Sequence, residues 1–133
     1  MGADSEEARV LANADVIATC AVRDIDKARK FYEGTLGLTQ LPTEEEGVLS
    51  YKCGKSSLLV YPSQYAGTNK ATAATWAVDD LEATARALKA KGVRFEHYDL
   101  PGTTRNGDIH GSGRTKAAWF KDPDGNILAL VSG

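Results

Sequence analysis

The chain has 133 residues, a formal net charge of −2, 42% hydrophobic residues and 26% charged residues. These values are typical of one globular domain with its own core. The small net charge gives no attraction to nucleic acid. No apolar run reaches the roughly 18 residues of a membrane-spanning helix, and no secretory signal is evident at the N-terminus. We therefore expect a cytoplasmic protein that binds neither nucleic acid nor membranes, with its two cysteines as free thiols.

The first half of the chain reads as one β-α-β-β-β module over residues 15–65. Residues 1–14 are polar and alanine-rich, so they form either a loose tail or a short helix. Asp24 is placed to cap a helix that ends at Gly37, where glycine provides a left-handed stop. The strands of this module are expected over residues 16–22, 38–41, 48–53 and 57–61.

The second half repeats this order over residues 72–132, which makes residues 15–132 a single domain of two modules. The acidic residues Asp24 and Asp80 lie 56 residues apart, and each follows an apolar run and precedes an amphipathic helix. Asp79 and Glu82 have the spacing of a capping box. Residues 99–115, with four glycines, are expected to form a long loop. The strands of this module are expected over residues 72–78, 93–98, 116–121 and 126–131.

The alternation of side chains along the strands predicts which residues face away from the two helices. Because Val22 and Val78 precede the helices and should pack under them, Thr19 and Thr75 point to the other face. On the last strand Ala129 faces the same way. This second face is small and apolar, so it is expected to line a cavity or to pack against another module.

Three segments resemble the vicinal oxygen chelate superfamily, which contains glyoxalase I, bleomycin-resistance proteins, extradiol dioxygenases and fosfomycin-resistance enzymes. They are Val-x-Asp-Ile-x-x-Ala-x-x-Phe-Tyr-x-x-x-Leu-Gly-Leu at 22–38, Val-x-Asp-Leu at 78–81, and Phe-x-Asp-Pro-Asp-Gly-Asn-Ile-Leu at 120–128. The resemblance implies an α+β fold of two βαβββ modules whose curved mixed sheets enclose a cavity. It also implies a homodimer.

The same resemblance indicates where metal ligands would lie, and this sequence departs from the pattern there. The matching positions are Ile17 on the first strand, Ala73 on its counterpart, Leu59 or Tyr61, and Ala129 on the last strand. None of these side chains is an imidazole or a carboxylate, and a catalytic metal needs such donors. We therefore expect no metal ion and no other cofactor.

The histidines give a weaker hypothesis. His97 and His110 flank the glycine-rich segment, with Asp99 and Asp108 close to them. Asp108 and His110 are candidates for an acid–base pair, because imidazole titrates near neutral pH. A solvated or hydrogen-bonding histidine in a mobile loop is the simpler interpretation.

Aromatic and hydroxyl side chains are the better candidates for ligand binding, since they suit planar or amphipathic molecules. Trp76 and Val78 are two residues apart on one strand and so face the same side. Trp76 is therefore expected in the core instead. The expected binding residues are Thr19, Tyr61, Tyr65, Thr75, Trp119 and Arg114.

Three functions remain open at this stage. The first is binding of a small aromatic or amphipathic molecule in an intermodule cavity, without metal. The second is a lyase or isomerase of the same fold that uses loop residues or a non-standard metal site. The third is a structural dimer that binds no ligand. Fold alone does not decide among them.

Overall fold

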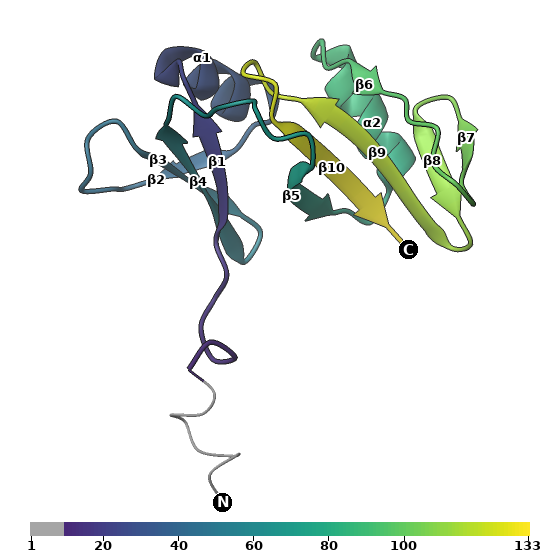
Figure 1. Ribbon diagram of the computed structural model, residues 1–133, viewed down its shortest axis with the longest axis horizontal. Coiled ribbons are helices and arrows are strands. Elements are labelled where there is room, and N and C mark those ends of the chain that lie inside the picture. Colours follow the sequence, from purple (N-terminus) through teal and green to yellow (C-terminus); the bar gives the residue numbers. More distant parts are fainter. Residues whose placement is uncertain (1–9) are drawn as a thin grey trace, which may run out of the picture.

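The computed structural model describes residues 10–133 and contains the two expected modules, each built on its own sheet (Figure 1). The first sheet has the order β1-β4-β3-β2 and the second the order β5-β10-β9-β8-β7, with β6 also pairing with β9. In each module the first strand runs parallel to the last, β1 with β4 and β5 with β10. The strands of the first module are β1 (Ala18–Val22), β2 (Thr39–Leu41), β3 (Leu49–Cys53) and β4 (Ser56–Pro62). Those of the second are β5 (Thr72–Ala77), β6 (Phe95–Glu96), β7 (Thr104–Asn106), β8 (Ile109–Ser112), β9 (Thr115–Lys121) and β10 (Ile127–Ser132).

The expected helices are present, with two differences in detail. Helix α1 (Ile25–Arg29) starts at Asp24, whose side chain accepts hydrogen bonds from the amides of Asp26 and Lys27, and it continues as the π-helix η3 (Lys30–Thr35). Helix α2 (Leu81–Ala90) is capped by Asp80, not by Asp79 as the capping box predicted. Asp80 accepts from the amide of Ala83, and the capping position was therefore misjudged by one residue. Neither α2 nor any other helix within residues 10–133 is long and apolar enough to cross a membrane.

The expected long loop over 99–115 is wrong, because the segment contains strands β7 and β8. Two-residue turns join β7 to β8 and β8 to β9, and each starts at a glycine with positive φ, Gly107 at 63° and Gly113 at 62°. Gly107-Asp108 has the residue types of a two-residue hairpin turn, since its first residue is a glycine that takes the positive φ such a turn needs. Residues 104–121 therefore form a three-stranded meander.

The helix-covered face of both sheets forms one continuous core. Burial alternates along β1 as expected, with Cys20 and Val22 buried and Thr19 exposed. Trp76 packs on the helix side, where its ring stacks on Phe120 with centroids 6.5 Å apart. The thiol of Cys20 is buried in this core, and burial raises its pKa to about 11. Both cysteines are free, as expected.

Buried polar contacts join the two modules within one chain. The hydroxyl of Tyr32 in η3 donates to Oδ2 of Asp122 in the β9–β10 turn, over 2.8 Å. The side-chain amide of Asn126 donates to Asp122 Oδ2 and to the carbonyl oxygen of Ala21 in β1, both at 2.7 Å. The linker also packs closely against the β9–β10 turn. A Cβ added at Gly67 would overlap the carbonyl oxygen of Asp124, so only glycine fits there. The modules therefore hold a defined relative position.

Candidate functional site

A hollow of about 340 Å³ lies where the two modules meet, between the start of β1, the β3–β4 hairpin and β5. We call it the seam hollow. Its volume is within the usual range of small-molecule sites. The wall combines apolar surface with hydroxyl groups. The residues that define it here are Ala18, Ser57, Leu58, Ala74, Thr75 and Trp76.

The side chains that line the seam hollow suit an amphipathic or aromatic ligand. Trp76 offers a large ring surface, and Ser57 and Thr75 offer hydroxyl groups that donate or accept hydrogen bonds. Cys53 also reaches this wall, but burial raises the pKa of its thiol, which keeps it protonated and unreactive near neutral pH. The wall of the hollow therefore offers ring surface and hydrogen-bonding hydroxyl groups, and no activated nucleophile is found among its lining residues.

The expected binding residues fall into separate groups. Thr75 lines the seam hollow, and the strand register puts it beside Ala129, which in turn lies beside Trp119 on the helix-free face. Thr19 and Tyr61 occupy the same face of the other sheet. Tyr65 is exposed on the linker, and Arg114 is exposed in the β8–β9 turn. The structure therefore does not gather all six residues around one cavity.

Trp76 is a site residue that the sequence did not identify as one. The alternation of side chains along β5 correctly placed Trp76 toward the helices. Trp76 is only partly buried, however, and it also lines the seam hollow. The hollow lies at the junction of two sheets. The alternation of residues along a single strand therefore cannot predict which side chains line it.

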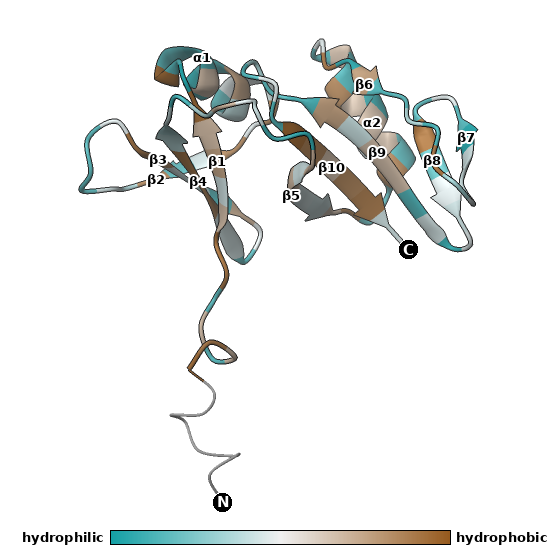
Figure 2. Ribbon diagram, in the orientation of Figure 1, coloured by the Kyte–Doolittle hydropathy of each residue, from teal (hydrophilic) through white to brown (hydrophobic). Residues whose placement is uncertain are grey.

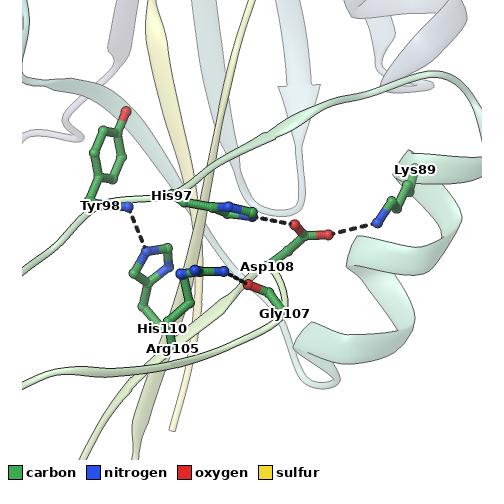
Figure 3. A network of polar contacts seen from close by, with 7 residues as sticks. All are labelled: Lys89, His97, Tyr98, Arg105, Gly107, Asp108 and His110. Atoms are coloured by element: carbon green, nitrogen blue, oxygen red, sulfur yellow. Dashed lines mark hydrogen bonds and ion pairs between the residues drawn. The ribbon is translucent and has the colours of Figure 1, made fainter.

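Asp108 and His110 bind different partners instead of each other (Figure 3). Asp108 accepts from Nζ of Lys89 at 3.1 Å and lies 2.7 Å from Nε2 of His97. His110 is buried on β8, and its Nε2 accepts from the backbone amide of Tyr98 at 3.0 Å. Since Nε2 is an acceptor, neutral His110 carries its proton on Nδ1, which has no hydrogen-bond partner among the described residues. A direct acid–base pair is not formed in this arrangement.

Two aromatic rings flank His110. Its ring lies edge-on to Trp119, with centroids 4.9 Å apart, and tilted against Tyr98, with centroids 6.2 Å apart. Arg105 lies directly opposite His110 in the β7–β8 register. The simpler interpretation is therefore right that His110 forms a hydrogen bond and wrong that it lies in a mobile loop, because the β7–β8–β9 meander buries it.

The Asp108 cluster links the β7–β8 hairpin to α2 and to the segment after β6, and it should make stability depend on pH. The hydrogen bond from His97, followed by that from Lys89, lowers the pKa of the Asp108 carboxyl below its ordinary 3.8. A lowered folded-state pKa stabilises the protein above the unfolded value, and this stabilisation is lost as the pH falls through the folded value.

Asp108→Asn is therefore expected to lower the unfolding free energy at pH 7 by about 1 kcal/mol or less, since the group is partly exposed. The difference from the wild type should shrink as the pH falls from about 5 through the lowered folded-state pKa of Asp108. Thermal unfolding at several pH values measures this. Asp99→Asn is the matched control, because Asp99 is exposed and its side chain forms no hydrogen bond or ion pair with another described residue. A wild-type advantage that persists unchanged at low pH would contradict the assignment.

The positions at which the resemblance places the superfamily's metal ligands offer no imidazole or carboxylate, and their only oxygen is the hydroxyl of Tyr61, the alternative to Leu59. Ile17 is exposed just before β1, Ala73 and Leu59 lie on β5 and β4, and Ala129 is buried on β10. Aliphatic side chains cannot coordinate a cation. Across residues 10–133, no cluster of three or more His, Cys, Asp or Glu side chains is arranged to hold a metal ion. The residues present do not fit the metal centre of the superfamily's enzymes.

Comparisons with known proteins agree on one family. The sequence model of the Glyoxalase/Bleomycin resistance protein/Dioxygenase superfamily matches residues 15–130. Lactoylglutathione lyase of Haemophilus influenzae is 31% identical over 123 residues, covering 83% of this chain and 85% of the relative. A probable lactoylglutathione lyase of Vibrio parahaemolyticus is 29% identical over 126 residues, covering 83% of each chain.

Solved structures share the fold at lower identity. Lactoylglutathione lyase from Agrobacterium tumefaciens superposes with a TM-score of 0.65 at 19% identity, covering 91% of this chain and 94% of that one. TnmS3, described as an antibiotic binding protein from Streptomyces, superposes with a TM-score of 0.63 at 21% identity, covering 90% and 97%. The fosfomycin resistance protein FosX from Mesorhizobium loti gives 0.63 at 13% identity, covering 92% and 93%.

Proposed function

We propose that this chain, which belongs to the Glyoxalase/Bleomycin resistance protein/Dioxygenase superfamily, binds a small aromatic or amphipathic molecule in the seam hollow without a metal ion. The observation that carries the proposal is the composition of the wall of the hollow, to which Trp76, Ser57 and Thr75 all contribute. The absence of donor atoms at Ile17, Ala73 and Ala129 supports a role in binding over metal-dependent catalysis.

A screen for thermal stabilisation tests the proposal directly. A ligand at a hundred times its dissociation constant stabilises the folded state by about 2.7 kcal/mol, which raises the melting temperature by several degrees. A library of aromatic, amphipathic and purely polar compounds should give hits in the first two classes only. If no compound stabilises the protein, the third alternative, a dimer that binds no ligand, is favoured instead.

A lyase or isomerase activity is the second candidate function, and the names of the two sequence relatives favour it. Such an activity would need a catalytic centre outside the usual ligand positions, with Asp108 and His110 as the residues to examine. An assay for lactoylglutathione lyase activity, with and without added Zn²⁺ or Ni²⁺, separates the two candidates. Turnover that depends on added metal would favour the enzyme.

Metal content gives a further prediction. Because aliphatic side chains occupy the expected ligand positions, the purified protein should contain far less than one equivalent of Zn, Fe, Mn or Ni per chain. Chelator should leave its melting temperature unchanged. Elemental analysis by mass spectrometry and melting curves with EDTA measure both. Close to one equivalent of metal, removable with loss of stability, would overturn the metal-free proposal.

A further inference from the structure

A second hollow, of about 370 Å³, lies where η3, the β9–β10 turn and the segment between α2 and β6 come together (Figure 1). We call it the basic crevice. It shares no lining residue with the seam hollow, so it is a separate candidate site. Figure 2 shows a hydrophilic β9–β10 turn at its rim, in contrast to the hydrophobic strand β10. Both modules contribute to its wall, with Phe31, Thr35, Lys91, Val93, Arg94 and Lys121 among the lining residues.

Positive charge in the basic crevice is left without a partner. The two carboxylates in its wall are already engaged. Asp122 is 5% exposed and accepts hydrogen bonds from inside the protein, and Oε1 of Glu96 lies 3.5 Å from Nζ of Lys121. Lys91 and Arg94 are exposed, and in the described part of the chain their side chains form no hydrogen bond or ion pair. Two cations in the wall are therefore available to an anion.

The C-terminal end of α2 borders the basic crevice but does not cancel this charge. A helix C-terminus carries roughly half a negative charge, which is less than the two cations that follow it. The carbonyl oxygen of Leu88 is also satisfied, because it accepts from the amides of Lys91 and Val93. Nζ of Lys91 would lie 3.9 Å from a Cβ at Gly37, so this cation reaches from the end of α2 toward the first module.

The same wall offers apolar surface. The Phe31 ring is held in place, since it lies edge-on to Tyr32 with centroids 5.2 Å apart and tilted against Phe120 with centroids 6.3 Å apart. Val93 adds a buried aliphatic side chain, and Thr35 adds a hydroxyl group from the end of η3. Turns of π-helix such as η3 occur frequently at functional sites. The crevice therefore suits a molecule with a charged head and an apolar body.

We propose that the basic crevice binds a small organic anion, with its carboxylate or phosphate group on Lys91 and Arg94 and its ring on Phe31. Guanidinium and ammonium groups donate charge-assisted hydrogen bonds to both kinds of anion. An aromatic body covers the Phe31 ring and gains apolar contact there. The bound molecule contacts η3 and the segment after α2 at once, so it joins the two modules. This inference does not depend on the ligand proposed for the seam hollow.

Isothermal titration calorimetry tests the proposal with three probes that share one ring system: naphthoate, naphthyl phosphate and the uncharged naphthamide. At about 50 mM salt, at least one anion should bind about tenfold more tightly than naphthamide, and the tighter anion identifies the preferred head group. Raising the salt to about 500 mM should weaken that anion about threefold, since exposed charges are screened. Equal affinities for all three probes, or no binding of either anion at millimolar concentration, would overturn the proposal.

Variants test whether the anion lies in the basic crevice. Lys91→Gln and Arg94→Gln should each weaken the anion about threefold, and the double variant about tenfold, to the level of naphthamide. Naphthamide binding and the circular dichroism spectrum should not change, since both side chains are exposed. Lys70→Gln is the matched control, because Lys70 is exposed on the linker and lines neither hollow, and it should bind the anion like the wild type.

Thr75→Trp separates this proposal from the one made for the seam hollow. The variant fills the seam hollow and leaves the basic crevice open, so it should retain the wild-type affinity for the anion. An affinity that falls in Thr75→Trp but not in the two crevice variants would place the anion in the seam hollow. That result would overturn the basic crevice as an anion site and leave the proposal for the seam hollow standing.

Discussion

Asp122→Ala is expected to lower the free energy of unfolding by about 3–5 kcal/mol, because it leaves several buried donors without an acceptor. Besides Tyr32 and the Asn126 side chain, the backbone amides of Asp124 and Asn126 donate to Asp122, at 3.0 and 2.8 Å. Burial raises the pKa of Tyr32, so its hydroxyl stays protonated and remains a donor. Denaturant unfolding, with the slope checked for two-state behaviour, measures the loss.

Asp124→Ala is the matched control in the same turn. The Oδ2 atom of Asp124 is buried and accepts no hydrogen bond from a described residue, so this side chain contributes little. We expect a change within about 1 kcal/mol. If both variants lost the same stability, the effect would come from the turn conformation and not from the bonds that join the modules.

Thr75→Trp is expected to weaken ligand binding by about a hundredfold or more, because an indole at this position fills the seam hollow. Thr75 is exposed, so the larger side chain can be accommodated without repacking the core. The measurement is calorimetric titration with the compound that stabilises the wild type most strongly. A melting temperature close to that of the wild type would confirm that the variant folds.

The internal repeat provides the control for this variant. Thr19 lies 56 residues before Thr75, is exposed on the same helix-free side, and does not line the seam hollow. Thr19→Trp should therefore change the affinity by less than threefold. Equal losses in both variants would indicate that the ligand lies across the helix-free face of both sheets, as the sequence first suggested, and would overturn the seam hollow as its site.

Local chemistry in the sequence was sufficient to identify the modules and their order. Asp24 caps α1 because its carboxylate satisfies amides at the helix start, and Gly37 follows η3 with φ of 72°. The alternation of Cys20 and Val22 with Thr19 correctly placed the helix side of β1. These features depend on neighbours within a few residues, so they can be read from the sequence.

The meander over residues 104–121 shows a limit of the interpretation. Gly107-Asp108 is typical of a two-residue hairpin turn, but four glycines within residues 99–115 also fit a long loop. The loop assignment also gave His110 the wrong environment, because His110 belongs to β8 and is buried against Trp119. A residue assigned to the wrong kind of element is also assigned the wrong environment.

The sequence by itself determined the superfamily, the two modules and the lack of metal-ligand side chains at the expected positions. These depend on residue identity and on short-range periodicity. Only the tertiary structure decided that Asp108 pairs with His97 and Lys89, and that Trp76 reaches a hollow between two sheets. Those contacts join strands and helices that are distant along the chain. Their geometry is set by how the two sheets pack and by the turns that orient them, so no local pattern specifies it.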